Sequence, residues 1–301
     1  MKIGLVLTGG GARGAYQIGV MKALRELSID KYIKVISGTS IGALNAILFM
    51  SDDIDKAIYI WESISKKEIL PIDEKNLTIR SIILHFGIKN MNFIKKYIPT
   101  MILGGNISRD GLINIMNKID FDFIKKSEII CYASCTNLKE LTPKYFKIND
   151  YKEEDIKKIL LATSAMPIIY DYEEIESAEY LDGGIVDNVP IQPVYGENCD
   201  IIIVVHLAKE SDIDKRLFPN THIIEIIPTI MEDGLFEGTL NFDKDMSKRR
   251  MNIGYNDTIE MIKPIMELTR YIDNGEREEV KDKLRFNNKK KRFINIIKLR
   301  F

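Results

Sequence analysis

A serine on a sharp turn between a strand and a helix is the first feature of this sequence that could do chemistry. Ser40 lies in the pentapeptide GTSIG, between the apolar run IKVIS and the helix-like stretch ALNAILFM. In this setting the G-x-S-x-G pattern is typical of a nucleophile elbow, with Gly38 and Gly42 leaving room for the cramped turn. A helix N-terminus under Ser40 would favour the alkoxide and oxyanion of acyl transfer. The pattern predicts Ser40 as a nucleophile; the alternative is an N-cap serine.

A glycine-rich stretch, LTGGGARG at residues 7–14, connects an earlier strand to a helix. Its backbone N–H groups would point at a bound anion. Three of its glycines have the G-x-G-x-x-G spacing of a dinucleotide site, but such a site needs an acidic residue after the second strand, and GTSIG occupies that place. Loops that leave adjacent parallel strands lie side by side, so we expect the N–H groups of Gly10 and Gly11 near Ser40, where they would bind an oxyanion.

A nucleophilic serine needs a base, and the sequence offers two candidates. His206, at the end of a strand, is the best placed of three histidines. The Ser, acid, His order of α/β-hydrolases fits poorly, because only one strand and one helix precede the strand that leads to Ser40. A structural role therefore suits His206 better. The other candidate is Asp182 in YLDGGIVDNVP, although an Asp-Gly pair alone is more often a simple turn.

The elements that must position these residues follow an alternating pattern. Continuous apolar runs alternate with stretches of helical periodicity, which is typical of a parallel sheet with helices on its faces. The sequence therefore predicts the α/β class. We expect helices at 15–27, 43–50, 53–64, 110–119, 153–165 and about 248–272, and strands at 3–8, 33–37, 129–138, 144–148, 200–207 and 222–228, the last two central in the sheet.

Composition and charge narrow the functional class. The 301 residues are 45% hydrophobic and carry a formal net charge of −1, which gives no general attraction for nucleic acid. Three cysteines are too few and too scattered for a disulfide framework and fit a reducing compartment. No window has the roughly 18 apolar residues of a membrane span. We therefore expect a cytoplasmic protein, in solution or peripheral at a membrane.

Four motifs in this order, GGGARGAYQIGV, GTSIGALNA, ATSAMPIIY and DGGIVDNVP, resemble those of patatin-like phospholipases and lipid acyl hydrolases. The resemblance covers residues 3–207, and GYNDT at 254–258 resembles the family's late helix more weakly. It implies a three-layer α/β/α fold with a mainly parallel sheet and a Ser-Asp dyad in place of a triad.

The same resemblance implies roles for individual residues. Ser40 matches the family's nucleophile and Asp182 its base. Ser164 and Pro167 match a structural block near the site, and Tyr170 stands where an aromatic residue is usual. The residues that match the oxyanion element are Gly9, Gly10, Gly11 and Arg13, although Arg13 could equally be a solvated first-turn residue.

One domain accounts for the whole chain, since no linker divides it. We expect a catalytic core at 1–207 and, at 208–301, an extension of the same domain with a long helix and a basic tail. Within the core, the looser stretch 65–106 is either a lid or cap over a cleft or an ordinary helical insertion.

The expected function is hydrolysis of fatty-acyl esters of phospholipids or other lipids through an acyl-enzyme, with no cofactor and no metal. The alternatives are a soluble carboxylesterase or thioesterase for small acyl substrates and a non-catalytic lipid-binding module. The tail RFNNKKKRFINIIKLRF combines basic and apolar residues, so it is either a helix that contacts an anionic membrane or a last core element such as a strand. The oligomeric state is not predicted.

Overall fold

The computed structural model describes residues 1–69, 71, 107–167, 169–210 and 213–298, and side chains as far as residue 272 except those of 235 and 236. Most of the predicted lid or cap at 65–106 lies outside the described residues. The chain divides into two compact units, Met1–Asp257 and Thr258–Phe301. Residues 208–257 therefore belong to the same unit as the predicted catalytic core.

The described residues form one sheet of eight strands in the order β5-β6-β3-β2-β1-β7-β8, with β4 paired to β3. Strands β3, β2, β1, β7 and β8 are parallel, while β4, β5 and β6 are antiparallel to their neighbours. The predicted α/β class with a mainly parallel sheet is confirmed. The strands are β1 Ile3–Leu7, β2 Ile33–Thr39, β3 Ile130–Asn137, β4 Pro143–Lys147, β5 Glu173–Ile175, β6 Ala178–Asp182, β7 Ile201–Val205 and β8 His222–Ile226.

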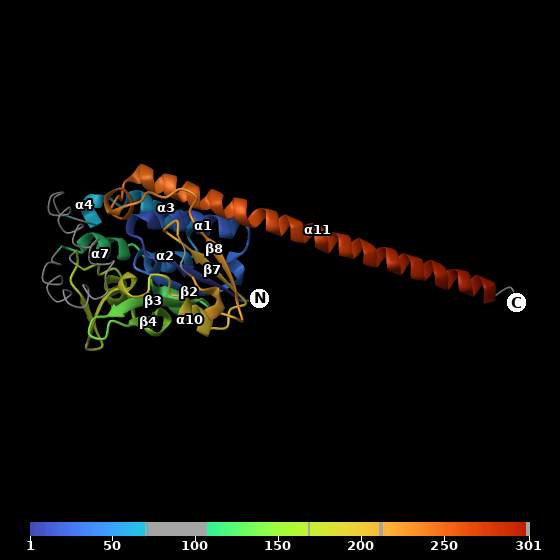
Figure 1. Ribbon diagram of the computed structural model, residues 1–301, viewed down its shortest axis with the longest axis horizontal. Coiled ribbons are helices and arrows are strands. Elements are labelled where there is room, and N and C mark those ends of the chain that lie inside the picture. Colours follow the sequence, from blue (N-terminus) through green and yellow to red (C-terminus); the bar gives the residue numbers. More distant parts are fainter. Residues whose placement is uncertain (70, 72–106, 168, 211–212, 299–301) are drawn as a thin grey trace. The chain divides into compact units, whose positions relative to one another are not determined.

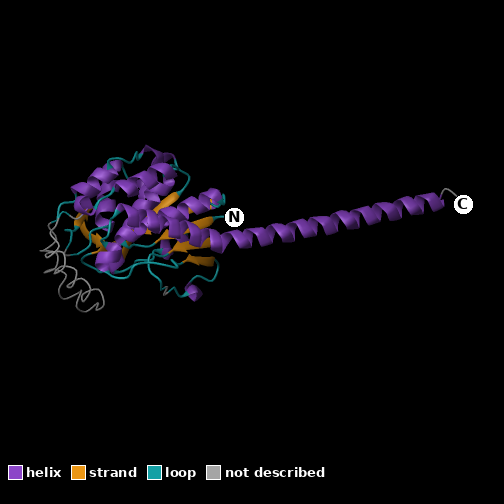
Figure 2. Cartoon of the chain, turned by 90° about the horizontal axis from the view of Figure 1, so that it is seen from above, coloured by secondary structure: helices purple, strands orange, loops and turns teal. Residues whose placement is uncertain are grey.

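Helices cover both faces of this sheet and make three layers (Figures 1 and 2). Helix α2 packs on β1, β2 and β3 from one side together with α1 and α9, whereas α10 packs on β1, β2 and β7 from the other. Under α10 the buried core includes Val6, Val194 and Val204. The helices are α1 Ala15–Glu26, α2 Ile41–Met50, α3 Ile54–Ser63, α4 Lys66–Ile69, α7 Asp110–Met116, α8 Asp122–Lys126, α9 Glu153–Thr163, α10 Ile191–Gly196 and α11 Lys244–Lys298.

The register of the two first strands places their loops together. β1 and β2 are parallel neighbours, and Leu7 at the end of β1 pairs with Gly38 near the end of β2. The glycine loop that follows Leu7 and the elbow that follows Gly38 therefore leave the same edge of the sheet side by side, as the sequence predicts.

Helix α11 is longer than predicted and contains Pro264. Its backbone is helical through Lys298, so a terminal strand is excluded as far as that residue. Inside the first unit, Asp257 of the GYNDT motif accepts hydrogen bonds from the Tyr16 hydroxyl at 2.9 Å and from Thr229. In the part of the chain that the structure describes, no helix is both long and apolar enough to cross a membrane.

One predicted strand forms, but its predicted position in the sheet was wrong. The stretch HIIEIIP was expected to be a central strand, but among the described strands β8 pairs only with β7 and forms an edge of the sheet. Its side chains are correspondingly less buried, and His222 is exposed. The apolar residues of β8 pack on a single neighbouring strand, which continuous hydrophobicity alone does not distinguish from a central position.

Candidate active site

Ser40 lies on a strained turn between β2 and α2. Its backbone has φ 55° and ψ −123°, a conformation that residues other than glycine rarely adopt. Gly42 permits the turn, because a Cβ there would lie 2.2 Å from the Leu7 carbonyl oxygen, and one on Gly38 would lie 2.4 Å from the Ala43 nitrogen. The geometry is that of a nucleophile elbow, with the Ser40 side chain projecting from the edge of the sheet.

A buried threonine fixes this turn. The Ser40 N–H donates to the Thr163 hydroxyl at 2.9 Å, and that hydroxyl donates in turn to the Ser134 carbonyl within β3. Thr163 is fully buried at the end of α9. The bond removes the Ser40 N–H as an oxyanion donor and ties the elbow to β3 and α9. Thr163 belongs to the motif ATSAMPIIY, but nothing in the pattern of that motif indicates a contact with Ser40.

The glycine loop lies directly against Ser40. A Cβ on Gly9 would be 3.3 Å from the Ser40 Cβ. Gly11 has φ 58° and its Cα faces the Thr239 carbonyl, so no other residue fits there. Within the described chain, the N–H groups of Gly10 and Gly11 donate to no other group. Two unpaired donors beside a projecting serine are what an oxyanion requires.

Gly9 and Arg13, the other two predicted oxyanion residues, have different partners. The Gly9 N–H donates to the Asn188 side-chain oxygen at 3.1 Å. The Arg13 guanidinium donates to the Gly234 carbonyl at 2.8 Å. Burial and the neighbouring Arg250 lower the pKa of Arg13. The geometry therefore gives Arg13 a part in fastening the glycine loop to the segment around residue 234.

Asp182 lies at the end of β6, in antiparallel register with Cys135 of β3. Its side chain is buried, with 6% exposed, and accepts a hydrogen bond from the Gly184 N–H at 2.8 Å. Burial raises the pKa of Asp182 from 3.8 to about 6, while the Ser40 hydroxyl and the Gly184 N–H act in the opposite direction. The structure thus brings the two residues of the predicted dyad together.

Asn188 is a residue of this site that sequence reasoning missed. Besides accepting from the Gly9 N–H, its amide donates to the Gly9 carbonyl at 3.4 Å. Asn188 comes from the loop that follows Asp182, so it couples the acid's loop to the glycine loop. The adjacent Asp187 accepts a hydrogen bond from Tyr145 at 2.6 Å, which anchors the same loop to β4. The motif DGGIVDNVP therefore supplies both the acid, Asp182, and the residue that links its loop to the glycine loop, Asn188.

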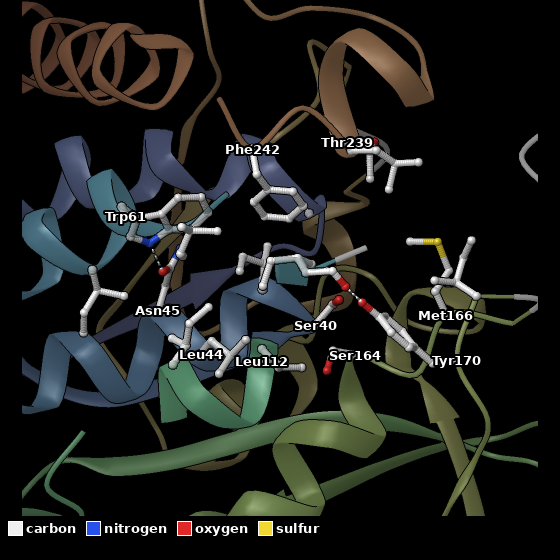
Figure 3. Close-up of a pocket in the computed structure, with 18 of the residues that line it drawn as sticks. Ser40, Leu44, Asn45, Trp61, Leu112, Ser164, Met166, Tyr170, Thr239 and Phe242 are labelled. Atoms are coloured by element: carbon white, nitrogen blue, oxygen red, sulfur yellow. Dashed lines mark hydrogen bonds between the residues drawn. The ribbon is translucent and has the colours of Figure 1, made fainter. Parts of the chain in front are cut away.

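An apolar cavity lies beside Ser40. Figure 3 shows Ser40 between Trp61 and Asn45 at one end and Met166 and Tyr170 at the other. The lining residues are Gly11, Ser40, Ile41, Leu44, Asn45, Leu48, Ile60, Trp61, Ile64, Ile69, Leu112, Ile115, Ser164, Met166, Ile169, Tyr170, Thr239, Leu240 and Phe242. Most of them are apolar, so the cavity suits a hydrocarbon group better than a polar one.

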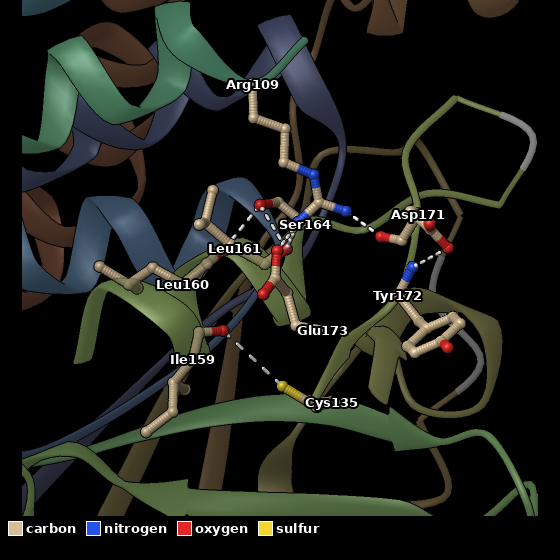
Figure 4. A network of polar contacts seen from close by, with 9 residues as sticks. All are labelled: Arg109, Cys135, Ile159, Leu160, Leu161, Ser164, Asp171, Tyr172 and Glu173. Carbon is tan, nitrogen blue, oxygen red and sulfur yellow. Dashed lines mark hydrogen bonds and ion pairs between the residues drawn. The ribbon is translucent and has the colours of Figure 1, made fainter. Parts of the chain in front are cut away.

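A network around Arg109 shapes the side of the cavity near Tyr170 (Figure 4). The guanidinium donates to the Glu173 carboxylate at 2.7 Å and to the Asp171 carbonyl, and it stacks on the Tyr170 ring at 5.1 Å. Tyr170 donates its hydroxyl to the Ile69 carbonyl at 2.6 Å. Ser164 donates to the Leu160 carbonyl at 2.6 Å. The Ser164 bond agrees with the structural role that the resemblance implies for Ser164, and Pro167 of the same block is buried.

His206 lies apart from this cavity, at the end of β7. Its ring nitrogen lies 3.1 Å from the Glu225 carboxylate on β8. Burial lowers the pKa of His206, and Glu225 opposes that effect. Over the described ranges, no three His, Cys, Asp or Glu side chains come together as a metal site would require. Asp182 therefore contacts Ser40, whereas His206 pairs with Glu225 on β8.

Comparison with known proteins finds a matching family model and related sequences. A family model described as patatin-like phospholipase matches residues 5–195, which is more than half of the chain and includes Ser40 and Asp182. Lysophospholipase nte1 of Aspergillus terreus is 27% identical over 212 residues, covering 70% of this chain and 12% of that protein. An uncharacterised NTE family protein of Mycobacterium tuberculosis is 25% identical over 206 residues, covering 68% and 49% respectively.

Among solved structures, VipD from Legionella pneumophila has a similar fold, with a TM-score of 0.50 and 16% identity, covering 87% of this chain and 67% of that one. The sequence relatives are longer than this chain, which spans 12% of the fungal protein and about half of the mycobacterial one.

Proposed function

This chain belongs to the patatin-like phospholipase family, as its four motifs predict, and we propose that it hydrolyses fatty-acyl esters of lipids through Ser40 and Asp182. One observation carries the proposal. A serine on a strained elbow lines an apolar cavity, contacts a buried acid whose pKa is raised to about 6, and lies against a glycine loop with two unpaired N–H groups. Each of these features serves acyl transfer. A protein that only binds lipid needs the cavity, but it needs neither the strained serine, nor the buried acid, nor the unpaired N–H groups.

The proposed reaction has two steps. Asp182 accepts the Ser40 proton as the oxygen attacks the ester carbonyl, and the N–H groups of Gly10 and Gly11 stabilise the oxyanion. Asp182 then gives that proton to the leaving alcohol. Asp182 next accepts a proton from water as the water oxygen attacks the acyl-enzyme carbonyl, and it returns that proton to the Ser40 oxygen as the ester bond breaks and the fatty acid is released. A carboxylate with a pKa of about 6 is a stronger base than an ordinary aspartate and is still largely ionised at pH 7.

Active-site labelling tests this proposal. A fluorophosphonate reacts with an activated serine, and mass mapping identifies the modified peptide. We expect a single label on Ser40 that Ser40→Ala abolishes. Ser164 is a matched control, because it lines the same cavity but donates its hydroxyl to a backbone carbonyl. Ser164→Ala should label like the wild type. Folded wild-type protein that takes no label, or takes it on another serine, would contradict the proposed nucleophile.

We also propose that the basic tail, residues 288–301, holds the enzyme on an anionic lipid surface. The tail contains Lys289, Lys290, Lys291 and Arg292 together with apolar residues. Earlier in the same helix, Met261, Ile265, Leu268 and Ile272 recur every three or four residues and are 40%, 60%, 60% and 54% exposed. An exposed apolar stripe followed by a basic segment is typical of a helix that lies in a membrane interface.

Vesicle sedimentation tests the role of the tail. Wild-type protein should sediment with vesicles that contain phosphatidylserine and much less with pure phosphatidylcholine. Replacing the three lysines at 289–291 by glutamate keeps the length of the chain and should reduce binding to the anionic vesicles at least tenfold, at about 1 kcal/mol per basic residue lost. Binding that is unchanged by this charge reversal, or equal on both kinds of vesicle, would rule out the role.

A further inference from the structure

Asn188 holds two consecutive peptide units of the glycine loop. Its side-chain oxygen accepts from the Gly9 N–H at 3.1 Å, which belongs to the Thr8–Gly9 peptide. Its amide N–H donates to the Gly9 carbonyl at 3.4 Å, which belongs to the Gly9–Gly10 peptide. The carbonyl end of the first of these peptides is held separately, because Thr8 accepts from the buried Gln17 amide at 2.8 Å. In the second peptide, by contrast, the carbonyl depends on Asn188.

The Gly9 carbonyl determines the direction of an oxyanion donor. A trans peptide is planar, and its carbonyl and N–H point in opposite directions. The Gly9–Gly10 peptide is trans, so the Gly10 N–H points away from the Asn188 amide that binds the Gly9 carbonyl. That N–H is one of the two unpaired donors beside Ser40. Rotating the peptide away from Asn188 would rotate this donor by the same angle.

The second donor, the Gly11 N–H, has a different support. The Gly10 carbonyl accepts from the Arg13 backbone N–H at 3.3 Å, at the start of the short helical turn Gly11–Gly14. This local bond orients the Gly10–Gly11 peptide and with it the Gly11 N–H. The Gly9–Gly10 peptide lies before the turn, and glycine restricts its own backbone least of all residues, so its orientation requires a partner from outside the loop. Loss of the Asn188 amide should therefore misdirect one donor and leave the other in place.

We propose that Asn188 is a positioning residue, which directs the Gly10 N–H at the negative charge that develops on the substrate carbonyl oxygen. The proposal rests on the proposed function, because it assumes that Ser40 attacks an ester. Asn188 is exposed, so replacing it opens no cavity in the core. Removing an oxyanion donor outright lowers kcat about 10²- to 10³-fold, and we expect a donor that is present but misdirected to cost about ten- to a hundredfold.

Steady-state kinetics of two variants at pH 8 tests the donated hydrogen bond. Asn188→Ala removes both bonds to Gly9, whereas Asn188→Asp keeps the shape and the bond from the Gly9 N–H but cannot donate to the Gly9 carbonyl. Both should lower kcat on a short-chain ester about ten- to a hundredfold and change KM less than about twofold. Gln192→Ala is a matched control, because it removes an exposed amide on the following helix, α10, and should keep wild-type kcat. Wild-type kcat in Asn188→Asp would overturn the role.

Binding of a transition-state analogue separates this role from general damage to the site. With an alkyl trifluoromethyl ketone, the Ser40 oxygen bonds to the ketone carbon, the carbonyl electron pair becomes an oxyanion and the Ser40 proton passes to Asp182. In both Asn188 variants, affinity for the ketone should fall by the same factor as kcat/KM, because the adduct needs the oxyanion donors. Affinity for a primary alcohol of the same chain length, which forms no oxyanion, should be unchanged. Equal losses for the two ligands would overturn the proposal.

The pH profile reports whether the side chain at 188 lies beside the acid. A Cβ on Gly184 would be 3.1 Å from an Asp182 carboxylate oxygen and 3.2 Å from the Asn188 oxygen, so the two oxygens flank one point. The negative charge introduced by Asn188→Asp should raise the pKa of Asp182 and move the rise of kcat/KM to higher pH. The expected shift is at least about half a unit, the effect of a unit charge about 6 Å away in water. Asn188→Ala should leave the rise in place.

The outcomes separate this proposal from the proposed function. An active wild type whose Asn188 variants keep wild-type kcat, or an Asn188→Asp profile that does not move, would overturn the role of Asn188 alone. A folded wild type that hydrolyses no ester and binds the ketone no more tightly than the alcohol would overturn both.

Discussion

Replacing Asp182 by asparagine is expected to lower kcat at least a thousandfold with little change in KM. Asparagine nearly matches the carboxylate in shape and can still accept the hydrogen bond from the Gly184 N–H, but it cannot accept the Ser40 proton. General-base catalysis contributes about 10² to 10⁴ to the rate, and here Asp182 acts in both steps. The measurement is steady-state hydrolysis of a short-chain ester. Retention of more than a tenth of wild-type activity would contradict the dyad.

The same carboxylate predicts a pH dependence. A pKa of about 6 means that the base form of Asp182 predominates above pH 6, so kcat/KM should rise as pH increases through about 6 and then level off. The raised pKa of Asp182 affects stability in the opposite direction: activity rises with pH, whereas the free energy of unfolding falls. Between 3.8, the ordinary pKa, and about 6 the unfolded chain loses this proton while the folded protein retains it, so folding becomes less favourable as pH rises.

Asp182→Asn should therefore stabilise the folded protein above pH 6 while destroying its activity. A shift of about two pKa units corresponds to roughly 3 kcal/mol, which is an upper bound because asparagine forms a poorer hydrogen bond with Ser40. Urea unfolding at pH 4 and at pH 8 measures the difference. A variant less stable than wild type at both pH values would show that the buried carboxyl is not held in a costly ionised state.

The fold near the amino terminus was predictable because its signals are local. Strands β1 and β2 are continuous apolar runs, the glycines mark the loops, and the parallel pairing follows from the alternation of strands and helices. The motifs predicted that Ser40 and Asp182 lie together, and the structure adds that Asp182 reaches Ser40 from an antiparallel strand. The three residues Ala178, Glu179 and Tyr180 that begin this strand mix small, charged and aromatic side chains, a pattern too short to predict a strand.

The residues that hold the site in place were not predictable, because their partners are far away in the sequence. Thr163 contacts Ser40 across 123 positions and Asn188 contacts Gly9 across 179. Periodicity and capping patterns describe neighbours within one element, so they say nothing about such pairs. The same holds for the segment around Gly234, whose contact with Arg13 spans 221 positions.

Arg250 is the second residue whose replacement should have a large effect, in this case on stability. Its side chain is fully buried, and all its donors are used. It donates to the Glu232 carboxylate at 3.0 Å and to the Ala12 carbonyl at 3.2 Å. The remaining acceptors are the carbonyls of Glu237, Gly238 and Asn241. One guanidinium therefore fastens the segment that carries Thr239 onto the glycine loop.

Arg250→Met keeps the length of the side chain but leaves a carboxylate and four carbonyls without this partner. Breaking a buried ion pair in this way costs about 3 to 5 kcal/mol of unfolding free energy. Arg249 is a matched control, because it is the preceding residue of the same helix and is exposed. Arg249→Met should change the free energy by less than about 0.5 kcal/mol. Denaturant unfolding of both variants measures the difference, and losses of similar size would show that Arg250 contributes no more than a surface charge. A large loss for Arg250→Met alone would mean that the segment after residue 207 is part of the framework of the active site, because the oxyanion loop depends on it.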